Sequence, residues 1–197
     1  MKRVAEKLAT YIVNSKKSSE EDFIIYMYGM QIGIEIILCM IVSFGISIYL
    51  HCFFEFMLFI SIFVLLRTYV GGLHFEKFGI CFLCSNIVQV GILFMNKVYQ
   101  FPLIISWSII VIGGMLLGIT APIENVNRML DLDAKRYCRK NLSKILIGLV
   151  VFIGFLTLFG KDKYISLVAY TLLVVVSSAA LGIVKFNIEK RKLKNID

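Results

Sequence analysis

Long apolar stretches constrain the fold of this chain more than any other feature of its sequence. A helix that crosses a lipid bilayer needs about 20 apolar residues, within a range of about 17–25. Apolar residues make up 59% of the 197 residues, and charged residues only 17%. A soluble domain carries roughly 45–50% apolar and about 25% charged residues, so the composition excludes a soluble enzyme, a disordered chain and a free nucleic-acid-binding domain. The apolar stretches are 23–50, 53–66, 78–95, 102–120, 145–160 and 164–184.

These stretches predict an all-α fold, a polytopic integral membrane helical bundle of about six transmembrane helices. The stretch at 53–66 is short and contains Glu55, so four or five spans stay open as alternatives. Ahead of the bundle, apolar residues recur with helical spacing, which predicts an amphipathic helix on the membrane surface or packed on the bundle. The expected regions are an interfacial segment over 1–22, a transmembrane domain over 23–184 and a basic cytoplasmic tail over 185–197.

The distribution of positive charge predicts the orientation of the chain in its membrane. Cytoplasmic loops of membrane proteins carry an excess of lysine and arginine. If the chain makes six spans with both termini in the cytoplasm, only Lys97, Lys161 and Lys163 of its 21 cationic residues lie outside. The net charge of +8 is then a consequence of topology, and no nucleic-acid partner is needed to explain it.

One segment between two apolar stretches, residues 67–86, concentrates residues that can carry chemistry. Polar and ionisable groups at membrane depth are costly, which makes them functional candidates by default. The adjacent glycines in this segment offer a backbone that can turn sharply. The candidate residues of this segment are Arg67, Gly71, Gly72, His74, Glu76, Lys77, Cys81, Cys84 and Asn86.

His74 and Cys81 form a candidate base and nucleophile. An imidazole beside a thiol can take its proton and hold a reactive thiolate. Seven residues of a continuous helix rise about 10.5 Å, so the pair requires the chain to turn between the two residues. We expect Cys81 at the start of the third span, where a helix N-terminus attracts negative charge. Cys84 lies one turn deeper, where burial in lipid penalises a thiolate.

Three other interpretations of this segment stay open. A histidine at a membrane boundary and a cysteine in a span are most simply interfacial and packing residues. Cys81 and Cys84 also match the C-x-x-C pattern of a membrane oxidoreductase, and a non-enzymatic transporter or peptide-export component would use Glu35 within the membrane. The five cysteines are irregularly spaced and indicate neither a disulfide framework nor a zinc site, so no metal or other cofactor is expected.

Two motifs in the chain resemble the accessory gene regulator B (AgrB) family. They are Arg67-x3-Gly71-Gly72-x-His74-x6-Cys81 and Ala121-Pro122-x-Glu124-Asn125-x2-Arg128. The resemblance covers essentially the whole chain and implies an integral membrane cysteine endopeptidase of Gram-positive quorum sensing. In that family's terms, His74 would be the general base and Cys81 the nucleophile. Arg67, Gly71 and Gly72 would be motif residues without an assigned chemical role. The candidates to orient the base are Glu76, Asn86 and Glu124.

The resemblance also implies a substrate, a product and a location. The substrate is a short propeptide of the accessory gene regulator D type, with an amphipathic leader, a central cysteine and an acidic C-terminal tail. Cys81 would release the tail and form an acyl-enzyme thioester, which the substrate's own cysteine would attack to close a thiolactone. The enzyme would lie in the plasma membrane of a Gram-positive bacterium. The charge distribution described above predicts that its active site is on the cytoplasmic side.

Basic and small residues predict further contacts. The basic loop expected over 128–144 and the basic tail could attract the acidic end of the substrate, although the positive-inside bias alone also explains these charges. Gly113, Gly114 and Gly118 would let helices approach closely. They predict either a homodimer or close packing of spans within one chain.

Overall fold

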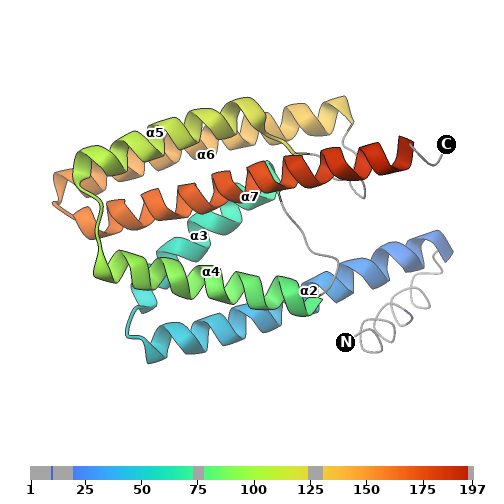
Figure 1. The fold of residues 1–197 in the computed structure, drawn as a ribbon, viewed down its shortest axis with the longest axis horizontal. Helices are drawn as coiled ribbons and strands as arrows, with labels where there is room; N and C mark the ends of the chain where they lie inside the picture. Colours follow the sequence, from blue (N-terminus) through green and yellow to red (C-terminus); the bar gives the residue numbers. More distant parts are fainter. Residues whose placement is uncertain (1–9, 11–19, 73–77, 124–130, 195–197) are drawn as a thin grey trace. The chain divides into compact units, whose positions relative to one another are not determined.

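The computed structural model of the protein describes residue 10 and the ranges 20–72, 78–123 and 131–194, and every regular element in these ranges is an α-helix (Figure 1). The expected all-α fold is therefore confirmed. The helices are α2 (Glu20–Tyr49), α3 (Phe53–Val70), α4 (Phe78–Val98), α5 (Leu103–Thr120), α6 (Leu132–Leu158) and α7 (Asp162–Lys194).

Five of these helices are long and apolar enough to cross a membrane, namely α3, α4, α5, α6 and α7. The stretch at 53–66 that was doubtful as a span is one of them, because its helix continues to Val70. In α2, which is 30 residues long, the described apolar part is Ile37–Tyr49. The chain is thus a polytopic helical membrane protein, and the sixth span stays a prediction. Of the segment 1–22, in which an amphipathic helix is expected, the structure describes only Thr10, which is helical, and residues 20–22, which begin α2.

The structure corrects the basic loop expected over 128–144. Residues 132–144 are not a loop, because α6 begins at Leu132 and continues without a break into its apolar half. The Asp131 side chain caps this helix by accepting a hydrogen bond from the Ala134 backbone N–H at 2.8 Å, as N-cap residues commonly do. The basic tail is helical as well, since α7 extends through Lys194. Apolar stretches mark the lipid-embedded part of a helix, whereas capping determines where the helix begins.

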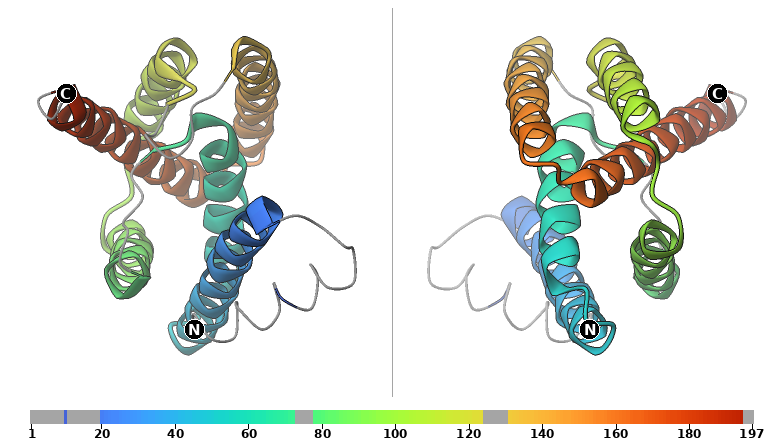
Figure 2. Two further views of the ribbon diagram at one scale, coloured as in Figure 1. Left: turned by 90° about the vertical axis from the view of Figure 1, so that its right-hand side faces the viewer. Right: turned by 90° about the vertical axis from the view of Figure 1, so that its left-hand side faces the viewer.

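The chain divides into two compact units, and α4 contributes to both. The smaller unit comprises residues 1–51 and 76–89, and the larger unit comprises residues 52–75 and 90–197. Within the larger unit, α7 packs against α3, α5 and α6 (Figure 2). Its core takes apolar side chains from all four of these helices, including Leu66, Val70, Ile110, Leu117, Leu142, Ile153, Val168 and Leu172.

Two of the three glycines considered for a dimer interface pack helices within the chain. A Cβ atom added to Gly113 would lie 3.2 Å from Leu172 Cδ2 on α7. One added to Gly114 would lie 3.7 Å from Leu146 Cδ2 on α6. No atom comes within 4 Å of the corresponding position at Gly118. Gly113 and Gly114 therefore serve close packing inside the larger unit, and the homodimer stays a prediction.

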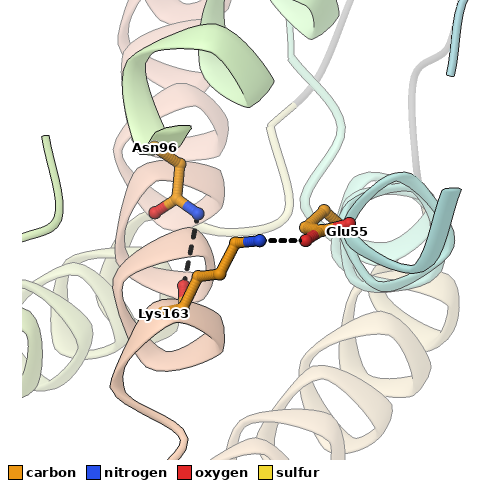
Figure 3. Close-up of polar contacts among 3 residues, drawn as sticks. All are labelled: Glu55, Asn96 and Lys163. Carbon is orange, nitrogen blue, oxygen red and sulfur yellow. Dashed lines mark hydrogen bonds and ion pairs between the residues drawn. The ribbon is translucent and has the colours of Figure 1, made fainter. Parts of the chain in front are cut away.

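An ion pair explains how α3 accommodates an acidic residue in its first turn. The Glu55 carboxylate of α3 accepts a hydrogen bond from the Lys163 ammonium group of α7 (Figure 3). The Asn96 side chain of α4 donates a hydrogen bond to the Lys163 backbone carbonyl at 3.2 Å. The Glu55 side chain is 13% exposed and that of Lys163 is 46% exposed. The charge that made this span doubtful thus has a partner on a neighbouring helix.

We expect Lys163→Met to lower the free energy of unfolding by about 1–2 kcal/mol, because it leaves the mostly buried Glu55 carboxylate without its cation. Thermal unfolding of the purified protein in detergent measures the change. Lys161→Met is the matched control, since Lys161 is exposed and its neighbour Lys163 carries the ion pair. Equal losses in both variants would show that the pair does not stabilise the larger unit.

Candidate active site

The side chain of Arg67 joins the C-terminal end of α3 to α7. Its Nη1 atom donates a hydrogen bond to the Gly71 carbonyl oxygen at 2.7 Å and another to Ser178 Oγ at 2.8 Å. Hydrogen bonds from a charged donor are shorter and stronger than neutral ones. We call Arg67, Gly71, Gly72 and Ser178 the arginine clamp; all four residues belong to the larger unit.

The glycines of the clamp are required by backbone conformation and by space. Gly71 and Gly72 have φ angles of 79° and 129°, which residues with a side chain rarely adopt. A Cβ atom on Gly72 would lie 1.8 Å from Arg67 Nη1. A Cβ atom on Gly71 would lie 2.8 Å from the backbone oxygen of Ile123. Both glycines therefore allow the chain to turn directly beside other groups.

The second motif meets the first at the end of α3. The Ile123 backbone N–H donates a hydrogen bond to the Val70 carbonyl at 2.8 Å. The last carbonyl groups of a helix have no partner within the helix, so residues 121–123 supply one. From α6, Arg139 Nη2 donates to the Ala121 carbonyl at 3.4 Å. The fold thus brings together two motif halves that are some fifty residues apart in the sequence.

The proposed nucleophile lies in the smaller unit. Cys81 is in the first turn of α4, as expected, with a free and partly buried thiol. Cys84 is also free and partly buried, one turn further along the helix. Each of the two cysteines is thus part of a helix that is long and apolar enough to span the membrane.

Asn86 is a buried residue that ties α4 to α2 within the smaller unit. Its Oδ1 atom accepts a hydrogen bond from Ser43 Oγ at 3.2 Å. Its Nδ2 atom donates to the Phe82 carbonyl at 2.8 Å and to Cys39 Sγ at 3.6 Å. These bonds give Asn86 a packing role between two helices. Its role in orienting a catalytic base stays a prediction.

Several predicted site residues lie outside the described part of the chain. They are His74, Glu76 and Glu124, and the side chain of Glu35 on α2 is likewise outside it. The pairing of His74 with Cys81 therefore stays a prediction. Within the described ranges, no three His, Cys, Asp or Glu side chains lie close enough together to hold a metal ion.

Cys52, between α2 and α3, differs from the cysteines of α4 in its surroundings. Burial, followed by the negative charge of Glu55, raises the pKa of the Cys52 thiol above its ordinary value. A raised pKa leaves less thiolate at neutral pH, and the thiolate is the reactive form. Cys52 should therefore react slowly with thiol-directed reagents.

Comparison with known proteins gives the family. Residues 5–181 match the family described as Accessory gene regulator B. The chain belongs to the AgrB family. It is also 24% identical, over 164 residues, to a Clostridium perfringens (strain SM101 / Type A) protein named "Putative AgrB-like protein". That alignment covers 80% of this chain and 75% of the relative.

No solved structure matches the chain significantly. Membership of the AgrB family supports an accessory gene regulator role in the processing of a quorum-sensing peptide. This role is compatible with a membrane protein whose two motif halves meet at the end of α3. The resemblance that the motifs predicted is thereby confirmed at the level of the family.

One residue of the clamp was not found from the sequence of this AgrB-family chain. Ser178 lies 111 residues after Arg67, in a mostly apolar stretch of α7. Hydroxyl groups in such stretches usually bond to their own helix, so the residue carries no recognisable signal. The only available indication was that an arginine at the end of an apolar stretch must find polar partners.

Proposed function

We propose that the chain is a membrane-embedded cysteine endopeptidase that removes the C-terminal tail from an autoinducing-peptide precursor and enables thiolactone closure. The observation that carries the proposal is the match to the AgrB family over residues 5–181. Two features support it in detail. Cys81 is in the first turn of α4, and the arginine clamp holds the chain at Gly71, three residues before His74.

The reaction follows from thiol chemistry. His74 takes the Cys81 proton, and the thiolate attacks the carbonyl carbon of the scissile peptide bond. The amine of the tail leaves with the proton from His74, and Cys81 keeps the peptide as a thioester. The substrate's own cysteine then attacks this thioester, so that one thioester replaces another and Cys81 is released. Water has to be kept away from the intermediate, and a site at the edge of the membrane favours this.

Two features of the described helices suit this substrate. The first-turn N–H groups of a helix lack partners within the helix and attract negative charge, so the start of α4 would favour the Cys81 thiolate. The acidic tail would meet cations on the exposed surfaces of α6 and α7. These include Arg136, Lys140, Lys144, Lys190 and Arg191. We place the site and both termini in the cytoplasm of a Gram-positive bacterium, with the propeptide, the lipid bilayer and a second copy of the chain as partners.

Co-expression with the short propeptide from the neighbouring reading frame tests the function. We expect mass spectrometry to find the free tail, together with a cyclised signal. A thiol-reactive probe with the sequence of the cleavage site should label Cys81 selectively, while Cys52 reacts slowly. Export of uncleaved propeptide without labelling would favour a transporter instead. A disulfide between Cys81 and Cys84 that forms and breaks during turnover would favour an oxidoreductase.

A further inference from the structure

We propose that Ser178 is a positioning residue for the reaction: it holds the Arg67 guanidinium, which in turn holds the Gly71–Gly72 turn that leads to His74. This inference rests on the proposed function. It assigns a physical role to Arg67 and to the two glycines of the motif. It also adds Ser178 to the site, a residue that is far from the motif in the sequence.

The hydrogen bonds of the clamp show that Arg67 connects two separate elements. A single nitrogen, Nη1, donates both to a turn carbonyl at 2.7 Å and to the α7 hydroxyl at 2.8 Å. Ser178 thereby supplies an acceptor from a helix whose inner face, with Leu172, Val175 and Ala179, lines the core of the larger unit. Because α7 packs against α3, α5 and α6, the hydroxyl is a fixed reference point for the turn.

The neighbouring hydroxyls of α7 behave differently. Ser177 Oγ donates to the Leu173 carbonyl at 2.7 Å, and Thr171 Oγ1 donates to the Leu167 carbonyl at 2.8 Å. Both bonds stay within the helix, as is usual for serine and threonine. Ser178 instead accepts a hydrogen bond from a charged group on α3. Ser177 is therefore a matched control for a substitution at Ser178.

Gly72 shows how closely the clamp surrounds the turn. A Cβ atom there would lie 1.8 Å from Arg67 Nη1 and 3.1 Å from Ser178 Oγ, so both side chains converge on this α-carbon. His74 follows two residues later. Two residues of chain reach at most about 7 Å, so the turn limits where the chain can place the proposed base. A misplacement of about 1 Å can lower a rate about a hundredfold.

The experiment compares Ser178→Ala, Ser178→Thr and Ser177→Ala in the full-length protein, purified into lipid nanodiscs. We expect Ser178→Ala to lower kcat for tail release about tenfold or more, with KM within about twofold of the wild-type value. Hydrogen exchange at the Gly71 and Ile123 amides should become faster, because the turn loses its anchor. Ser178→Thr keeps the hydroxyl and should restore both quantities, and Ser177→Ala should change neither.

Each outcome decides between the alternatives. Wild-type kcat in Ser178→Ala, or a lower kcat with unchanged exchange at Gly71 and Ile123, would overturn the positioning role. If Ser178→Ala does not fold, Arg67→Lys is measured in its place, because lysine keeps the charge but cannot present the same fork of donors. Wild-type kcat and wild-type exchange in Arg67→Lys would likewise overturn the positioning role. If the wild-type protein releases no tail, the proposed function fails, while the exchange comparison still tests whether Ser178 anchors the turn.

Discussion

Cys81→Ala should abolish release of the C-terminal tail, with a loss of at least about a thousandfold. Removal of a catalytic nucleophile leaves only the rate that binding and polarisation of the substrate provide. The thiol is partly buried in the first turn of α4, and alanine is compatible with a helix, so the variant should be inserted and folded like the wild type. Co-expression with the propeptide and mass spectrometry of the peptides measure the loss.

Cys84→Ala is the matched control for this substitution. Cys84 is in the same helix, also free and partly buried, and its replacement should retain most of the activity. His74→Ala should be as inactive as Cys81→Ala, because the Cys81 thiol would have no base to take its proton. An active Cys81→Ala together with an inactive Cys84→Ala would assign the nucleophile to Cys84 instead.

Gly72→Ala should lower tail release about a hundredfold and also destabilise the protein. The new methyl group would lie 1.8 Å from Arg67 Nη1, at a backbone φ of 129° that alanine rarely adopts. The guanidinium would have to leave its hydrogen bonds with Gly71 and Ser178, and the turn would move with it. Tail release and thermal unfolding in the same preparation measure the two effects.

Gly148→Ala and a double substitution make this test specific. Gly148 lies on α6 with no atom within 4 Å of an added Cβ, so alanine there should leave activity unchanged and slightly favour the helix. Arg67→Ala combined with Gly72→Ala removes the clash, which should restore part of the lost stability but no activity. Recovery of activity in the double variant would show that the clamp is dispensable.

Much of the fold follows from hydropathy, because lipid requires long apolar helices. The same criterion overlooks helical segments that extend beyond the lipid. The first turns of α6 are rich in charge and were predicted as a loop, although the Asp131 cap starts a helix there. Glu55 cast doubt on α3 as a span, since its partner Lys163 is 108 residues away in the sequence.

The candidate site was predictable in its residues but not in its contacts. The motifs name Arg67 and both glycines, yet their spacing does not reveal that Arg67 binds a hydroxyl on α7 or that Gly72 makes room for the guanidinium. Neither does it reveal that residues 121–123 provide a hydrogen-bond donor to the end of α3. Such contacts depend on how helices cross, which periodicity along a single helix does not encode.

The arginine clamp also has a consequence for the response of the protein to acidity. Arginine keeps its positive charge throughout the physiological pH range, whereas histidine gains and loses a proton within it. The hydrogen bonds from Arg67 to Gly71 and Ser178 therefore persist when the solution around the protein becomes more acidic. If His74 is the base of the proposed reaction, a change of pH would act on the reaction through its imidazole, while the Gly71–Gly72 turn keeps its hydrogen bonds.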